Sequence, residues 1–74
     1  MDRNTLERHL VLAEEHVAQG NRNISKQIAL IEKLKRDGHK TERAELLLEH
    51  FHEAQRLFRT ERDRMRRELE QHSR

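Results

Sequence analysis

The stretch "VAQGNRNISK", residues 17–26, decides the fold, because it is the one ambiguous break in an otherwise helical pattern. Gly20, Asn21 and Asn23 are weak helix formers, and their composition is typical of a turn. A turn here would give three short helices, whereas an unbroken stretch would give two long ones. The spacing of apolar residues on either side distinguishes these alternatives.

Apolar residues before and after this stretch keep a single heptad phase. Alternating steps of four and three residues follow one side of a helix, and they run through the glycine without an insertion or deletion. The positions are Leu6, Leu10, Ala13, Val17, Gly20, Ile24, Gln27, Ile31 and Leu34. The glycine and two asparagines cost roughly 2 kcal/mol, comparable with the burial of one leucine or isoleucine. The sequence therefore predicts one helix over residues 5–36, with Asn4 as its N-cap.

A second boundary lies in "KLKRDGHKTERAELL", residues 33–47. Cations end the first helix, Gly38 suits the position after a helix C-terminus, and Thr41 can cap the next helix. The pattern predicts a second helix over residues 41–70, joined by a loop of about three or four residues. Such a short loop makes the two helices antiparallel neighbours.

The predicted fold is a single all-α domain over residues 1–74, a helical hairpin with residues 71–74 frayed. Folding the chain about Gly38 places Gly20 opposite Phe58, where the missing side chain would leave room for the ring. The predicted core within the hairpin is Leu10, Ala13, Val17, Gly20, Ile24, Ile31, Leu34, Leu47, Phe51, Phe58 and Met65.

Further apolar residues lie beside this core and widen the apolar stripe near the loop, which indicates a second interface. The simplest closure is a homodimer that forms a four-helix bundle with coiled-coil packing. The predicted interface residues are Gln27, Ile28, Leu30, Leu48 and Leu57. The alternative is a monomeric three-helix bundle broken near Gly20.

Composition places the chain among small, highly charged proteins. Charged residues make up 41% of the 74 residues, the net charge is only +2, and proline and cysteine are absent. The N-terminus has no apolar segment typical of a signal peptide, and no apolar run approaches membrane-spanning length. We therefore expect a cytoplasmic protein with no membrane association.

The six histidines prompt a search for metal sites. Glu49 and His52 have the Glu-x-x-His spacing of di-iron bundles, but the helical phase places them outside the core. His9 and His16 share one side of the first helix without a third ligand, although a pH-sensitive patch remains an alternative. The hydroxyl residues and isolated glycines form no nucleophilic or phosphate-binding motif. We expect no metal, no cofactor, no catalytic residues and no enzymatic activity.

Arginines near the C-terminus give an alternative function. Arg59, Arg62, Arg66 and Arg67 could bind phosphates, as in the RNA-binding helical hairpin of the plasmid copy-control protein Rop, an analogy of fold alone. Acidic residues are interleaved with these arginines, and no aromatic residue lies among them to stack a base. A nucleic-acid-binding hairpin is therefore the alternative prediction of function.

The chain also resembles short, uncharacterised α-helical bacterial proteins, many from alphaproteobacteria. The resemblance is carried by "HVAQGNRNISKQIALIEKLKRDGHKTERAELLLEHF", residues 16–51, with a similar spacing in "QRLFRTERDRMRREL", residues 55–69. The shared pattern is G-x-x-x-I-x-x-Q-x-x-L-I-x-x-L followed by D-G-H-x-T. The matching residues are Gly20, Ile24, Gln27, Leu30, Ile31, Leu34, Gly38, Thr41, Ala44, Leu47, Leu48 and Phe51. The resemblance implies a small helical protein and no particular activity.

These observations favour a small interaction protein. With no catalytic or ligand-binding motif, the leading prediction is a regulatory or adaptor role through contacts with a protein partner whose identity the sequence does not reveal.

Overall fold

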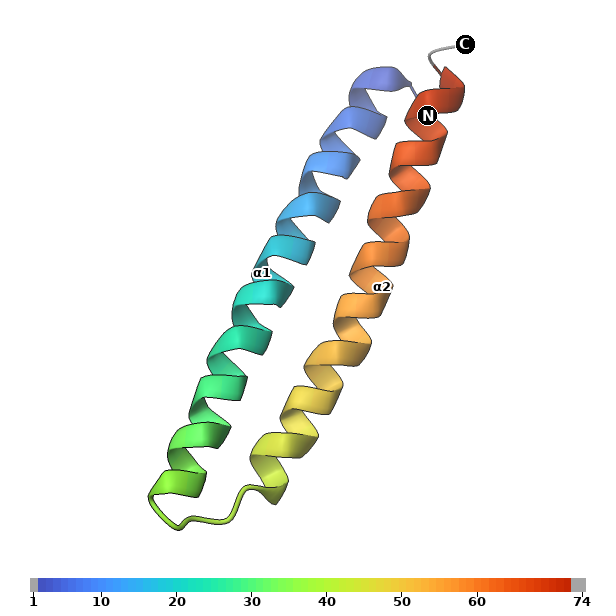
Figure 1. The fold of residues 1–74 in the computed structure, drawn as a ribbon. Helices are drawn as coiled ribbons and strands as arrows, with labels where there is room; N and C mark the ends of the chain where they lie inside the picture. The colour runs from blue at the N-terminus through green and yellow to red at the C-terminus, as the bar shows by residue number, and fades with distance from the viewer. Residues whose placement is uncertain (1, 73–74) are drawn as a thin grey trace.

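The computed structural model describes residues 2–72, which form two long helices packed side by side (Figure 1). Helix α1 (Arg3–Arg36) and helix α2 (Glu42–His72) run antiparallel, and the start of α1 lies beside the end of α2. The molecule is a rod of 57 × 14 × 14 Å. The all-α hairpin predicted from the sequence is confirmed.

Helix α1 continues through Gly20 as one 34-residue helix, so the three-helix alternative is wrong. It begins two residues earlier than predicted, and its N-cap is Asp2 rather than Asn4. The Asp2 carboxylate accepts a 2.7 Å hydrogen bond from the main-chain N–H of Thr5. A carboxylate at this position accepts a hydrogen bond from an otherwise unpaired N–H, and its negative charge interacts favourably with the positive end of the helix dipole. The hydrogen bonds from Thr5 lower the pKa of Asp2.

The loop confirms the predicted role of Gly38, which has φ +74°. The N–H of Gly38 donates to the carbonyl of Lys35 at 3.2 Å, and the N–H of His39 donates to the carbonyl of Leu34 at 2.9 Å. These bonds form a Schellman motif, which satisfies carbonyls at the end of α1. Helix α2 starts directly after Thr41 and extends to His72, two residues beyond the predicted end. Of the residues predicted to fray, 73 and 74 lie outside the described part.

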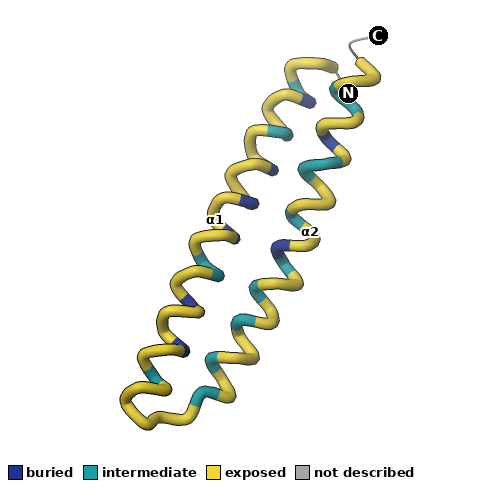
Figure 2. Tube along the Cα trace, viewed as in Figure 1, coloured by how far each residue is buried: buried dark blue, intermediate teal, exposed yellow. Residues whose placement is uncertain are grey.

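The core is a narrow seam between the helices (Figure 2). Half-buried members include Leu10, Ile24, Leu34, Phe51 and Phe58. The buried residues are Leu6, Ala13, Val17, Gly20, Gln27 and Ile31 in α1, and Gln55 and Met65 in α2.

Leu47 does not belong to this seam, contrary to prediction, and is 43% exposed. In α2 the inward positions follow the steps of three and four residues that include Leu48, Phe51, Gln55 and Phe58. The predicted core included Leu47 and left out Gln55, because it was built from apolar residues.

The residue facing Gly20 is Gln55, not Phe58 as predicted. Phe58 instead packs against His16, with ring centroids 5.1 Å apart and an interplanar angle of 33°. The close approach at Gly20 therefore accommodates a polar side chain rather than a ring.

Candidate functional site

Gln55 forms a polar layer in the middle of the seam and is only 2% exposed. Its Nε2 donates 2.8 Å hydrogen bonds to the carbonyl of Val17 and to Oδ1 of Asn21, both in α1. Its Oε1 is buried without a hydrogen-bond partner among the described residues and lies against Gly20. Two acceptors facing Nε2 fix the orientation of the amide, since a rotated amide would oppose oxygen to oxygen. This layer joins the two helices through hydrogen bonds at one level of the seam.

Gln27 forms a second polar contact across the seam, nearer the loop. It is 7% exposed, and its Nε2 donates a 2.8 Å hydrogen bond to the carbonyl of Ala44 in α2. Gln27 was predicted at the dimer interface, but burial within its own hairpin leaves it little surface for another chain. The two glutamines thus act inside the hairpin, each bonding to main chain of the opposite helix.

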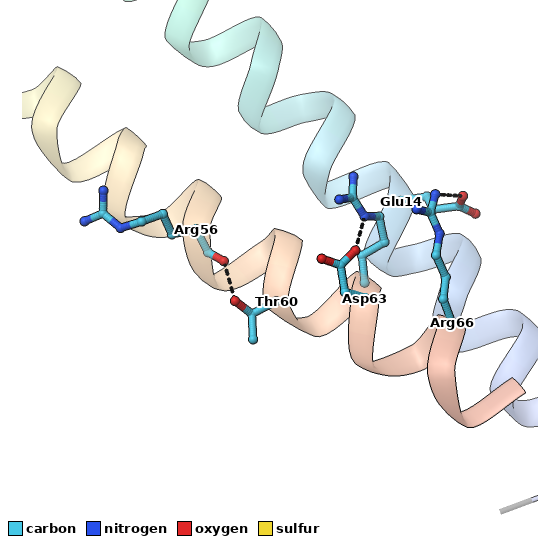
Figure 3. Close-up of polar contacts among 6 residues, drawn as sticks. Glu14, Arg56, Thr60, Asp63 and Arg66 are labelled. Atoms are coloured by element: carbon cyan, nitrogen blue, oxygen red, sulfur yellow. Dashed lines mark hydrogen bonds and ion pairs between the residues drawn. The ribbon is translucent and has the colours of Figure 1, made fainter. Parts of the chain in front are cut away.

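One side of the hairpin, which we call the polar flank, carries contacts between the helices at heptad intervals. Lys35 pairs with Glu45 at 3.7 Å, and Arg59 lies 3.4 Å from Oδ1 of Asn21. One heptad further, Glu14 pairs with Arg66 at 3.3 Å (Figure 3). Ile28, another predicted interface residue, occupies the corresponding heptad position between Lys35 and Asn21. Polar residues dominate this flank along its length.

The opposite side of the seam is apolar near the loop. His16 and Glu61 mark this side farther from the loop, where they line a shallow depression together with His9 and Leu12. Leu30 lies two heptads after His16, and Leu47 lies two heptads before Glu61, which places both leucines on the same side. We define the leucine flank as Leu30, Leu47 and Ala54, which share this side, together with Leu57, which lies at its outer edge three residues after Ala54.

The leucine flank is open to solvent. Leu30 is 44% exposed, Leu47 is 43% exposed, and Leu57 reaches 72%. Ala54 is half-buried. Large apolar side chains gathered on one side of a monomer are typical of an interaction site, whereas scattered ones are not.

The seam beside the leucine flank is also thinly covered. No residue of α2 before Gln55 is buried, although Ala44, Leu48 and Phe51 occupy seam positions there. Figure 2 shows this asymmetry, since the dark blue segments of α2 lie near its middle and towards the end away from the loop. One hairpin therefore leaves the loop-proximal part of its own core partly exposed to water.

The predicted dimer-interface residues are not brought together on one surface. Gln27 is buried and Leu48 lies half-buried in the seam. Ile28 lies on the polar flank, and only Leu30 and Leu57 belong to the leucine flank. Leu47, which was assigned to the core, is the residue that prediction missed at this surface. Leu47 lies eight residues before Gln55, one residue out of the heptad step that links Leu48 to Gln55. This spacing assigns Leu47 to the flank once Gln55 is recognised as a seam residue.

The arginines predicted to bind nucleic acid are largely engaged with polar groups of the hairpin. Arg62 is half-buried and pairs with Asp63 at 3.1 Å, and Arg66 pairs with Glu14 (Figure 3). Arg59 contacts Asn21. Arg67 has no ion pair within the described residues. Partial neutralisation of these cations weakens attraction for phosphates.

The other candidate sites are dispersed. Glu49 and His52 are exposed, as the helical phase predicted. Within residues 2–72, no three histidine or carboxylate side chains are grouped so that they could hold a metal ion. In the same range, neither helix combines the length and apolar character needed to cross a membrane.

Comparison with protein-family models, with curated proteins and with solved structures gave no match for this chain. The resemblance to short bacterial helical proteins therefore stays a prediction.

Proposed function

We propose that this protein is a helical interaction module with a regulatory or adaptor role, and that it binds a protein through the leucine flank. The observation that supports this most is the exposure of Leu30, Leu47 and Leu57 beside a seam that one hairpin leaves partly open. A third helix or a second hairpin placed there would complete the core and remove several large side chains from water. Each fully buried leucine contributes about 1.5–3 kcal/mol.

A second copy of the hairpin is one such occupant, and a four-helix bundle would cover both helices of each copy. The nucleic-acid reading has weaker support, because Glu14 and Asp63 partly neutralise the arginine side. We therefore favour protein binding over nucleic-acid binding, and we propose that it takes place in the cytoplasm.

The test compares two neighbouring substitutions. Leu47→Glu places a charge on the leucine flank, whereas Leu46→Glu places the same charge on the outer side of α2, where Leu46 is 52% exposed. Each variant is used as bait in cell extract, after circular dichroism has shown that it is helical. We expect partners that are retained by the wild type and Leu46→Glu but lost with Leu47→Glu. If both variants retain the same partners, the leucine flank is not the binding surface.

A further inference from the structure

We infer that the partner on the leucine flank is an amphipathic helix from another protein, with an apolar stripe bordered by carboxylates. This inference rests on the proposed function and names the partner chemistry. It comes from the distribution of charge around the exposed leucines, which differs sharply between the two sides of the hairpin.

The helix positions that border the leucine flank carry only basic or neutral side chains. In α1 these positions hold Lys26 and Lys33, and in α2 they hold Arg43 and His50. All four residues are exposed, and within residues 2–72 the two lysines and the arginine have no ion pair. We call these four residues the cationic rim.

Most carboxylates of the same half lie elsewhere, and the exception is Asp37, the C-cap of α1, one heptad after Leu30. Glu45 pairs with Lys35 on the polar flank. Glu32, Glu42 and Glu49 occupy the positions bordering that flank, and Glu53 lies on the outer side of α2. Apart from Asp37 at the end of α1 and Glu53 on the outer side, the loop-proximal half is therefore polarised, with cations beside the leucines and carboxylates on the opposite side.

This combination matches a helix rather than a flat surface. The leucine flank runs along the seam between two packed helices, and half-buried Leu48 and Phe51 occupy seam positions of α2 between Leu47 and Leu57 in the sequence. A third helix can place apolar side chains against this strip at intervals of three and four residues. Glutamates beside that stripe would then face the cationic rim, adding attraction and fixing orientation.

A second copy fits this surface less well. In a twofold dimer the same patch meets itself. Two leucine flanks facing each other would bring Lys26, Lys33 and Arg43 of one copy near the corresponding cations of the other. Like charges brought together across an interface destabilise the complex. Charge complementarity therefore favours a different, acidic partner.

The experiment uses the full chain and two designed peptides of about three heptads with leucine at the a and d positions. One peptide carries glutamate at the flanking positions, and the other carries lysine there. Fluorescence anisotropy of each labelled peptide gives its Kd, measured at low and high salt. We expect the glutamate peptide to bind at least tenfold more tightly than the lysine peptide, with an affinity that falls as salt increases.

Charge reversal supplies the decisive variant, because the altered residues are exposed and their replacement leaves the seam intact. The Lys26→Glu/Lys33→Glu double variant should bind the glutamate peptide more weakly and the lysine peptide more tightly. The matched control is Glu32→Lys/Glu49→Lys on the other side, which should leave the preference unchanged. Leu47→Glu should abolish binding of both peptides, and Leu46→Glu should not.

The remaining outcomes separate this inference from the proposed function. Equal binding of both peptides would overturn the charge selection and leave the leucine flank as a binding surface. A dimer seen by sedimentation equilibrium, stable in the wild type and lost with Leu47→Glu, would overturn the acidic helix and support self-association on the same flank. Binding to anionic vesicles without binding to either peptide would overturn both proposals.

Discussion

The amide oxygen of Gln55 occupies the space that a β-carbon on Gly20 would need. The same amide donates through its nitrogen to the carbonyl of Val17, three residues before Gly20, and to Oδ1 of Asn21, one residue after it. Glycine is therefore required at this point by a close approach and not by its backbone conformation, which is helical. Gly20 and Gln55 thus form one closely packed contact between the two helices.

The first prediction concerns Gly20→Ala. Alanine favours the helix by about 1 kcal/mol, but its methyl group would displace the Gln55 amide and break two hydrogen bonds, each worth about 0.5–1.5 kcal/mol. We expect the free energy of unfolding to fall by roughly 1 kcal/mol, measured by urea denaturation at a fixed protein concentration.

The control for this prediction repeats the substitution in a chain that lacks the amide. In a Gln55→Ala background, Gly20→Ala should stabilise the protein, because the helix preference is then unopposed. The reversal of sign between the two backgrounds is the diagnostic result. Stabilisation in both backgrounds would mean that Gln55 moves aside at no cost.

Substitution of Gly38 in the loop should also lower the free energy of unfolding, but for a different reason. A β-carbon on Gly38 would meet nothing within 4 Å, so only its φ of +74° opposes substitution. Gly38→Ala should lower the free energy of unfolding by about 1 kcal/mol, and Gly38→Asn should cost less because asparagine tolerates this conformation better. Thermal melts of the three proteins compare them directly. Equal stability of the glycine and alanine forms would contradict the Schellman geometry.

The core and the leucine flank should differ in their response to truncation. Met65 is 3% exposed, so Met65→Ala should cost about 2 kcal/mol or more by leaving a cavity in the seam. Leu57 is 72% exposed, and Leu57→Ala should change the stability by less than about 0.5 kcal/mol. Urea denaturation measures both. A comparable loss at Leu57 in the monomer would show that its side chain packs within the hairpin.

The N-cap predicts a pH dependence. The Thr5 hydrogen bonds lower the pKa of Asp2 below 3.8, so the cap stabilises the folded chain above that pH. This stabilisation is lost as the pH falls through the folded-state pKa, where the carboxylate becomes protonated. The Asp2 titration midpoint, measured by NMR, should lie below 3.8, and Asp2→Asn should lose less stability on acidification. A midpoint at or above 3.8 would contradict the cap.

The elements of this fold were predictable because they depend on local signals. The unbroken heptad phase across Gly20 correctly indicated one long helix, and the cations, Gly38 and Thr41 marked the turn. The loop-centred pairing was less accurate, since it placed Phe58 rather than Gln55 against the glycine. Counting residues outward from Gly38 shows that the helices pair in opposite directions, but it does not show which side chains of each helix point inward.

The candidate surface was harder to predict because it depends on the same inward phase. Assigning apolar residues to the core put Leu47 inside and left Gln55 out. The buried glutamine donates two hydrogen bonds from Nε2 to acceptors on the opposite helix, while its Oε1 has no partner among the described residues. These contacts are visible only in three dimensions. With Gln55 in the seam, Leu48, one heptad earlier, also faces the seam, and its neighbour Leu47 therefore lies on the flank.

Amide hydrogen exchange, resolved by residue, tests the central claim most directly, namely that the loop-proximal half of the hairpin lacks full cover and is completed by a partner. In the free protein we predict faster exchange for residues 44–54 of α2 than for residues 55–66, because none of the former is buried. Addition of the glutamate peptide should slow exchange in residues 44–54 of the wild type but not of Leu47→Glu. Equal protection of the two segments in the free protein, with no change on adding the peptide, would contradict the claim.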